Sequence, residues 1–436
     1  MSAAALLLLA RLAACSPAHA ADPLVPEPLV PEPQVRGQLD WQGHPAMHMP
    51  WPMFGRGLRD RDPFMTWKHQ FRQTVHAPYL ERSGVRLFLT AAMAAERARN
   101  PEQARRLILR QLRYVEDVVE ANPDRYALAR SPADARELLT TTDKMVLVHS
   151  IEGGRQLLTR PEDAAFWADQ GVALVTLIHL YDDELGGAAL VPGLLGRMIN
   201  PAAARKHRKG QDRGLTARGR EALVELGQAG ILVDLSHMSP QAAAQALELT
   251  AAHGMPPVVT HGLLASITQV ERAFTDAQVV EIYRQGGSFN LGLDGVALDP
   301  VDPIVPIPPD LCPGTLDSFQ LHHQAVQRLL VDHAAEILAD PSLDPAHLSE
   351  DQRTALATGW SSDWNGWTSH SRPKYGPGHC RPLPDLPLEL DLVGLAHPGL
   401  LPQHWQRLAE QGTDLDPMLR SAEQFLRLWA RARGEG

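Results

Sequence analysis

Two histidines follow short apolar segments, and imidazole side chains in that position are suited to metal binding. His237 follows ILVDLS and His261 follows PPVVT. The segments 231–235 and 258–260 are apolar, short and bounded by Gly or Pro, which is typical of buried strands. Because parallel strands present their carboxyl ends at one edge, we expect both imidazoles to lie in one crevice. A single histidine is more often a hydrogen-bonded core residue, so the prediction rests on the pair.

Acidic and imidazole side chains end three further strand-like segments. Glu152 follows MVLVHSI and precedes two glycines, which let the backbone turn away from a bridging carboxylate, although a lone Glu before a turn is more often solvated. His179 follows the segment 172–178, and Asp363 follows the segment 356–361. An Asp that faces metal ions can take a proton from water and return it to a leaving amine.

The first strand-like segment, near 37–41, leads into Asp40-Trp41-Gln42-Gly43-His44. Alternate residues of a strand project to the same side, so we expect Asp40, Gln42 and His44 to share one face.

Strand-like and helical segments alternate along the chain, with amphipathic helices predicted at 101–122, 216–230 and 240–253. Strands are predicted near 37–41, 86–90, 145–149, 172–178, 230–235, 256–260, 286–292 and 356–361. This is the pattern of a (β/α)8 TIM-type barrel. Loops at 191–213 and 295–317 are long enough to be lids over the mouth. The segment 388–436 is predicted to be a helical C-terminal extension.

The charge composition bears on one class of partner, nucleic acids. The net charge is −10 over 436 residues, which argues against nucleic acid binding. The one basic stretch, 205–213, is expected to be a solvated loop, with contact to an anionic substrate as the less favoured reading.

The N-terminus has the features of an export signal over residues 1–20, with an apolar run and an Ala-His-Ala site but no basic residues before the run. Leu12-Ala13-Ala14-Cys15 also resembles a lipoprotein cleavage box, so a lipid anchor through Cys15 stays open. Residues 21–35 contain a repeated LVPEP and are predicted to be an extended linker. Residues 36–436 are expected to form a single barrel domain. We expect an exported protein, in a bacterial periplasm, as an outer-membrane lipoprotein, or secreted.

Six segments together resemble the membrane dipeptidase (renal dipeptidase-like) metallopeptidases of the amidohydrolase superfamily. They are VHSIEGG, TLIHLYDD, GLTARGREALVELGQAGILVDLSHMS, VVTHG, ERAFTDAQV and GWSSDWNGW, in the family's order across roughly residues 37–430. The resemblance implies an eight-stranded barrel with a binuclear zinc centre that hydrolyses dipeptides or similar small amides. Two-fold dimers are common in such barrels, so a homodimer is a further open alternative.

The resemblance assigns roles to individual residues. Glu152 is similar to the bridging carboxylate, and His237 and His261 to the imidazoles of the second metal. His179 resembles the histidine that holds the substrate carbonyl oxygen, and Arg272 the arginine that pairs with the substrate carboxylate. Asp363 resembles the proton-shuttling aspartate, and Asp234 a residue behind the ligands.

The first metal site departs from the family's Asp-x-His-x-Asp, because Gln42 stands where the histidine is expected. An amide oxygen is a poor zinc ligand, so His44, or His48 after it, is the alternative. We therefore expect one firmly bound zinc and a second site that is weak, differently occupied or empty.

The leading hypothesis is hydrolysis of a small amide by a metal-bound hydroxide. A ligand-binding pseudoenzyme that retains one zinc, and a hydrolase of a non-peptide substrate such as a lactone, are the alternatives. Pairing of Cys312 with Cys380, both in Pro-rich loops, is left open.

Overall fold

The structure is a computed structural model that describes residues 38–46, 49, 77–93, 98–191, 198, 200–211, 213–294, 308–364 and 370–435. The predicted export signal, the linker and His48 lie outside these residues, as does most of the predicted 295–317 loop. Within the described residues, no helix is both long and apolar enough to cross a bilayer.

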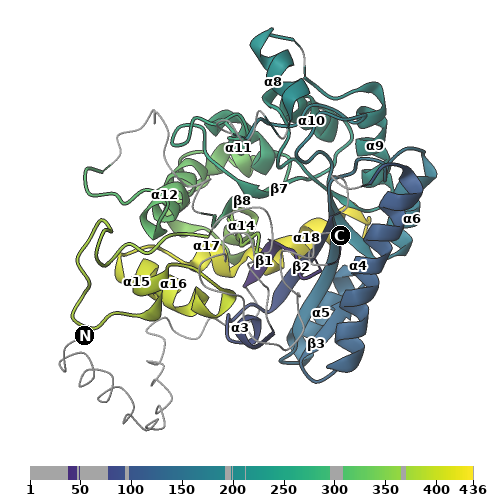
Figure 1. Ribbon diagram of the computed structural model, residues 1–436. Coiled ribbons are helices and arrows are strands. Elements are labelled where there is room, and N and C mark those ends of the chain that lie inside the picture. Colours follow the sequence, from purple (N-terminus) through teal and green to yellow (C-terminus); the bar gives the residue numbers. More distant parts are fainter. Residues whose placement is uncertain are drawn as a thin grey trace, which may run out of the picture.

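Eight parallel strands close into a barrel, which confirms the fold class predicted from the sequence (Figure 1). The barrel strands are β1 Leu39–Gly43, β2 Leu87–Met93, β4 Met145–Glu152, β5 Val172–Thr176, β6 Leu232–Asp234, β7 Pro257–Gly262, β8 Ser288–Gly292 and β9 Trp360–Ser361. Pairing of β2 with both β1 and β4, and of β1 with β9, closes the ring. All eight coincide with predicted strands, within a few residues at their ends.

One further strand, β3 (Tyr126–Ala129), was not predicted from the sequence. It pairs with β4 over Met145 to Val148, and β5 pairs with β4 over His149 to Glu152. The two neighbours thus share one edge of β4. The strand β3 is short, and its pairing depends on the length of β4, which a local pattern does not reveal.

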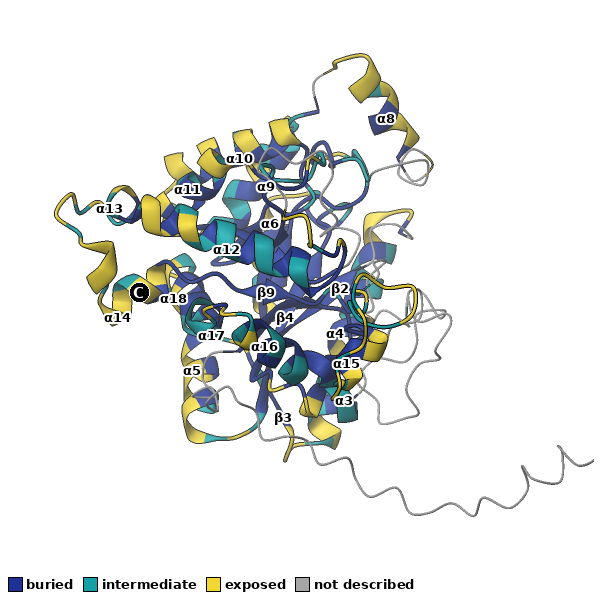
Figure 2. Ribbon diagram, turned by 90° about the vertical axis from the view of Figure 1, so that its left-hand side faces the viewer, coloured by how far each residue is buried: buried dark blue, intermediate teal, exposed yellow. Residues whose placement is uncertain are grey.

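Helices cover the outside of the barrel, and their exposed residues face away from the buried strands (Figure 2). The helices that follow successive strands are α3 Ala77–Glu81, α4 Pro101–Ala121, α5 Pro132–Thr141, α6 Glu162–Asp169, α8 Pro201–Arg208, α9 Ala217–Gln228, α10 Pro240–Ala252, α11 Asp276–Arg284, α12 Leu316–Asp332, α13 Ala334–Ile337 and α14 Glu350–Ala355. The three predicted helices are α4, α9 and α10, and Ser239 caps α10 as expected, by accepting a hydrogen bond from the Ala242 amide.

The C-terminal extension is helical, as predicted: α15 Glu389–Val393, α16 Leu401–Glu410, α17 Asp416–Leu419 and α18 Ser421–Ala432. The helix α18 lies across the amino-terminal end of the barrel, behind β1 and β2 in Figure 1. The Trp41 indole meets the Phe425 ring edge-on at 5.5 Å, and Ser288 Oγ at the start of β8 donates to Gln424 Oε1 at 2.7 Å. The barrel is thus closed at this end, and its opposite end carries the candidate chemistry.

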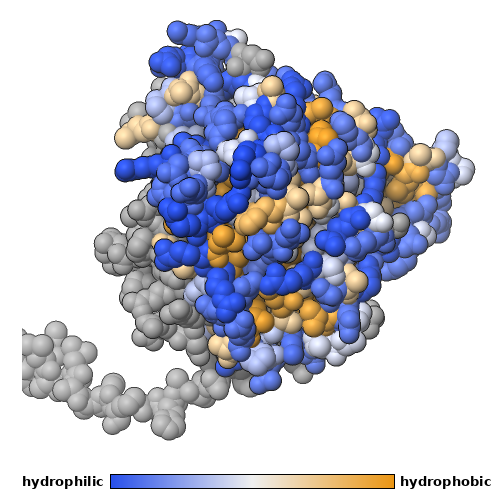
Figure 3. Space-filling model, turned by 90° about the vertical axis from the view of Figure 1, so that its right-hand side faces the viewer, coloured by the Kyte–Doolittle hydropathy of each residue, from blue (hydrophilic) through white to orange (hydrophobic). Residues whose placement is uncertain are grey.

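Hydrophilic side chains cover most of the face on the side of α4 and α6, with smaller apolar areas between them (Figure 3). This surface agrees with the acidic, mixed composition of the chain.

Candidate metal centre

Glu152 ends the longest barrel strand, β4, and is the centre of the site. Its side chain is 3% exposed. One ligand atom each of Glu152, His237 and His261 lies within 4.8 Å of the other two. The His237 and His261 Nε2 atoms are 3.5 and 3.8 Å from Glu152 Oε1. The structure therefore brings together the three ligands predicted for the firmly held metal.

The two imidazoles point their Nε2 atoms at each other at 2.6 Å. His237 follows β6 with a φ of +65°, a conformation that non-glycine residues rarely adopt. Asp363 after β9 has a φ of +52°. Strained backbone of this kind persists at sites where the surrounding structure fixes a side chain for a function.

A chain of hydrogen bonds behind His261 sets its tautomer. Thr260 Oγ1 donates to Asp234 Oδ2 at 2.8 Å, so it accepts from His261 Nδ1 at 2.7 Å. The Nε2 lone pair of His261 then faces Glu152. Asp234 is fully buried and also accepts hydrogen bonds from Thr176 Oγ1 and Ser236 Oγ. Because these hydrogen bonds occupy its oxygens, the Asp234 carboxylate orients the ligand His261 rather than binding the metal itself.

A second group of possible ligands shares Glu152. His44 Nε2 is 3.3 Å from Glu152 Oε2 and 3.0 Å from Asp363 Oδ1. His44 Nδ1 lies 3.1 Å from the Ala91 carbonyl oxygen, which can only accept, so Nδ1 carries a proton and Nε2 faces the carboxylates. Burial alone would lower the pKa of His44, but the Glu152 and Asp363 carboxylates raise it to about 10, so Nε2 must lose a proton before it can bind a cation. Ligand atoms of His44, Glu152 and Asp363 all lie within 4.8 Å of one another.

A β-bulge in β1 breaks the regular alternation expected for Asp40, Gln42 and His44. Asp40 pairs with Phe88 and Gly43 with Thr90, which leaves two residues of β1 opposite one of β2. Paired residues of parallel strands point to the same face. Met93 pairs with Glu152, so Phe88, and with it Asp40, points away from the site. The prediction that Asp40 shares a face with His44 is wrong.

Asp40 instead supports the turn that carries Asp363. It accepts hydrogen bonds from the Ser362 amide at 2.9 Å and the Ser362 hydroxyl at 2.5 Å. Burial raises the pKa of Asp40 to about 7, against the lowering effect of those bonds. The Asp363 amide donates to the Gln42 carbonyl oxygen at 2.9 Å, which ties the bulge to the same turn.

Gln42 is the residue that stands where the family has a histidine. Its side chain is fully buried, and both amide atoms lack a hydrogen-bond partner within the described part of the chain. His44, rather than Gln42, supplies the imidazole beside Glu152. The sequence shows this replacement of a histidine by Gln42. That His44 lies beside Glu152 could be seen only in the structure.

The electrostatics of the cluster fit a cation. Burial, and then the Arg272 charge, lowers the pKa of His237 well below its usual range and that of His261 to about 3. Burial would raise the pKa of Glu152, but His179 and His44 hold it well below its usual range. Two neutral imidazoles and an ionised carboxylate are the donor set that a divalent metal requires.

His179 and Arg272 lie beside the ligands. His179 Nε2 is 3.6 Å from Glu152 Oε1, and its ring meets the His237 ring edge-on at 4.6 Å. The Arg272 guanidinium donates to the His261 carbonyl oxygen at 2.8 Å. The structure thus gathers seven of the candidate site residues in one cluster: His44, Glu152, His179, His237, His261, Arg272 and Asp363.

The basic stretch 205–213 is not the loop expected from the sequence. Helix α8 covers its first half, and Arg213 is buried. Arg213 pairs with Asp182 at 3.3 Å and with Glu271 at 2.6 Å. These pairs join the segments after β5 and β7, next to Arg272.

Three polar residues that support this site were not predicted from the sequence to do so: Thr260, Ser362 and Arg213. Thr260 directly precedes His261 and Ser362 directly precedes Asp363, so adjacency to a candidate ligand was the available signal. Arg213 had no such signal, because its partners are distant in the sequence.

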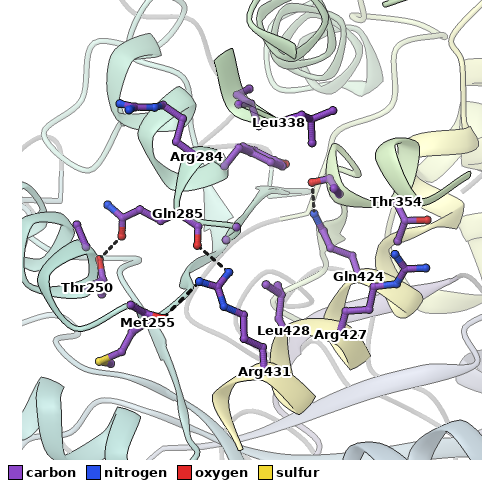
Figure 4. Close-up of a pocket in the computed structure, with 17 residues that line it drawn as sticks. Thr250, Met255, Arg284, Gln285, Leu338, Thr354, Gln424, Arg427, Leu428 and Arg431 are labelled. Atoms are coloured by element: carbon purple, nitrogen blue, oxygen red, sulfur yellow. Dashed lines mark hydrogen bonds between the residues drawn. The ribbon is translucent and has the colours of Figure 1, made fainter. Parts of the chain in front are cut away.

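A cavity of about 620 Å³ lies at the opposite end of the barrel, between α10, α11, α14 and α18. In Figure 4, Arg431 of α18 points toward Gln285, whose carbonyl oxygen accepts its hydrogen bond at 3.0 Å. Arginines, amides, hydroxyls and apolar residues line this cavity, and among the described residues its lining contains no histidine, cysteine or carboxylate. It has no donor set for a metal.

A family model for the membrane dipeptidases (peptidase family M19) matches residues 58–299, which is more than half of the chain. The chain belongs to this family. It is a family of metallopeptidases, so membership implies a metal, and the cluster around Glu152 offers the ligands.

Individual relatives are distant. An uncharacterized dipeptidase of Schizosaccharomyces pombe is 28% identical over 154 residues, which is 35% of this chain and 33% of that protein. The chain thus matches about a third of the length of this curated relative.

Solved structures share the fold at low sequence identity. The crystal structure of the probable dipeptidase PvdM from Pseudomonas aeruginosa aligns with a TM-score of 0.61 and 15% identity, over 93% of this chain and 98% of that one. A metallo peptidase from Rhodobacter sphaeroides, crystallised with a phosphinate mimic of the dipeptide L-Ala-D-Ala, aligns with a TM-score of 0.58 and 15% identity, over 91% of this chain and 99% of that one.

Proposed function

We propose that the protein is an exported zinc-dependent hydrolase of dipeptides or similar small amides. The observation that carries this proposal is the convergence of Glu152, His237 and His261 within 4.8 Å of one another at the mouth of the barrel. Imidazole and carboxylate ligands suit zinc better than magnesium or calcium, which prefer oxygen ligands alone.

Glu152, His237 and His261 would hold the first zinc, and His44, Glu152 and Asp363 a second cation. A bound divalent cation lowers the pKa of water and polarises a carbonyl oxygen. The second group has one imidazole and two carboxylates, an acceptable donor set for zinc. It supports a centre with two cations even though Gln42 replaces the expected histidine.

The protein's own side chains supply the remaining steps. Arg272 would pair with the substrate carboxylate, which positions the scissile bond over Glu152. His179 would donate a hydrogen bond to the carbonyl oxygen as negative charge develops there. Asp363 would accept a proton from water and return it to the leaving amine.

A dipeptide is the preferred substrate because the family is one of dipeptidases and Arg272 lies beside the ligands. A lactone has no free carboxylate for Arg272 to bind, so a substrate panel would separate the two. A pseudoenzyme with one structural zinc would need neither His179 nor Arg272, and their position beside Glu152 favours the enzyme.

Metal content and turnover of a dipeptide panel test the proposal together. We expect at least one zinc per chain and hydrolysis that is lost on chelation and restored by added zinc. The Glu152→Gln variant should lose metal and activity, whereas the matched surface variant Glu102→Gln should keep both. Less than half an equivalent of metal per chain in the wild type, together with no turnover, would contradict the proposal that the protein is an enzyme.

Export rests on the predicted signal at residues 1–20, with Cys15 as a possible site of lipid attachment. N-terminal sequencing and the mass of protein recovered from a bacterial periplasm would test the cleavage site. A lipid on Cys15 would add a mass that a plain cleavage does not.

A further inference from the structure

The segments that follow β8 and β9 lie side by side near the mouth of the barrel, and each contains one cysteine. The Arg381 guanidinium donates to the Asp310 carbonyl oxygen at 3.0 Å and to Asp310 Oδ2 at 2.8 Å. The Arg372 amide donates to the Gly314 carbonyl oxygen at 2.9 Å. These bonds flank Cys312 on both sides and place Cys380 against it.

Cys312 and Cys380 are both free thiols. The Cys380 thiol is near enough to contribute, after burial, to the raised pKa of Cys312. Cys312 is fully buried, and its amide donates to Asp317 Oδ2 at 3.2 Å. Asp317 Oδ1 in turn binds Lys374 Nζ at 2.6 Å. The backbone on both sides of the pair is thus held in place, and Cys380 alone is open to solvent.

We propose that Cys312 and Cys380 form a disulfide that clamps the segment after β8 to the segment after β9. The proposal rests on the juxtaposed thiols and the hydrogen bonds around them, and it is independent of the proposed hydrolase activity. Pairing does not require the two segments to separate from their present partners, because the flanking hydrogen bonds exist in the reduced form.

The oxidant is a small disulfide, such as oxidised glutathione. The Cys380 thiolate attacks it, forms a mixed disulfide and releases one thiol. The Cys312 thiolate then attacks the Cys380 sulfur, forms the protein disulfide and releases the second thiol. Two thiol groups are oxidised and one disulfide is reduced to two thiols, so electrons and protons balance. Burial raises the pKa of Cys312 to about 12, so the second step should be slow and should quicken as pH rises.

The cross-link would close a long ring of chain. The two cysteines are 68 residues apart in the sequence, and α12, β9 and Asp363 lie between them. Closing a ring of this length removes much of the freedom of the unfolded chain. The strand that carries Asp363 would then be covalently tied at both flanks.

Peptide mapping of the full-length protein, after incubation with oxidised glutathione at pH 8.5, tests the clamp. We expect one cross-linked peptide pair that contains Cys312 and Cys380, at the mass of a single chain, and its loss on reduction. Oxidation should raise the melting temperature by about 2–5 °C, and the Cys312→Ser variant should show no such rise.

The Cys312→Ser variant also separates the two chemical steps. Without its partner, Cys380 should retain the glutathione adduct that the wild type releases. The proposal is overturned if the wild type keeps the adduct on Cys380 to the same extent as this variant. It is also overturned if the cross-link joins two chains, which non-reducing electrophoresis would reveal.

Discussion

At the scale of single residues, two imidazoles of the candidate metal centre are oriented by hydrogen bonds on the nitrogen that faces away from Glu152. The His261 ring is fixed by Thr260, and Thr260 by Asp234. His44 is fixed by a backbone carbonyl of β2. Both rings therefore direct Nε2 toward Glu152, so neither has to rotate to bind a cation, although Nε2 of His44 must first lose its proton.

The Thr260→Val substitution tests this orientation, because valine keeps the shape of the side chain and removes the hydroxyl. His261 Nδ1 loses its acceptor and the ring loses its preferred tautomer. We expect metal affinity to fall about 10- to 100-fold. Competition with a chelator, followed by metal analysis, measures the change. Thr250→Val, at a buried hydroxyl in α10, is the matched control and should leave metal affinity unchanged. Equal affinity in both variants would contradict the assigned role of Thr260.

At the scale of elements, three ion pairs hold the segments around the mouth. Arg213 pairs with Asp182 after β5 and with Glu271 after β7, and Lys206 of α8 also pairs with Asp182 at 3.1 Å. Glu271 directly precedes Arg272. Arg213 and His207 both bind Glu271 Oε1, so this carboxylate is occupied by partners other than the guanidinium that is proposed to bind substrate.

Replacing Arg213 by Met should therefore affect substrate binding as well as stability. Glu271 would lose its buried partner and would compete for Arg272. We expect a loss of about 2–4 kcal/mol in the free energy of unfolding, since Lys206 still pairs with Asp182. The KM for dipeptides should rise more than kcat falls. Denaturant unfolding and steady-state kinetics measure both. Lys206→Met, at a half-exposed side chain, should cost less than about 1 kcal/mol. A change in kcat alone would argue against competition by Glu271.

The barrel strands also show how much of the fold and of the site could be predicted from the sequence. Most barrel strands lie in short apolar runs, and the site residues lie at or just after the ends of those runs, so these strands and candidate ligands could be predicted locally. The bulge in β1 could not, because it exists only in the pairing with β2. The partners of Arg213 were hidden for a similar reason, since Asp182 and Glu271 are 31 and 58 residues away. Long-range pairing is set by the closed barrel and leaves little trace in a local pattern.

At the scale of the whole molecule, the two ends of the barrel have different tasks. The helix α18 closes the amino-terminal end, and its Gln424 side chain binds the starts of β8 and β9 through Ser288 Oγ and the Ala357 carbonyl oxygen. The carboxyl-terminal end carries the candidate ligands on separate strands. Packing at the amino-terminal end stabilises the barrel, and the candidate chemistry lies at the carboxyl-terminal end. The strained backbone at His237 and Asp363 is therefore confined to the end that carries the ligands.

Buried histidines far from the candidate metal centre should make the fold sensitive to acid. Burial lowers the pKa of His322 and His404 to about 3 and that of His323 to about 4. Unfolded histidine has a pKa of about 6.5, so below that pH the unfolded chain binds more protons than the folded one. Stability is thus fully present above pH 6.5 and is lost as the pH falls toward 4. The slope should be on the order of 1 kcal/mol per pH unit for each histidine.

The His404→Leu variant isolates this effect. Both ring nitrogens of His404 lack partners within the described residues, so leucine removes a titrating group without removing a hydrogen bond there. Denaturant unfolding from pH 7 to 4.5, in chelator so that metal loss does not contribute, should show a shallower pH dependence than in the wild type. The exposed His347→Leu is the matched control and should keep the wild-type slope. If His404→Leu and the wild type lose stability in parallel, protonation of this buried ring does not drive acid unfolding.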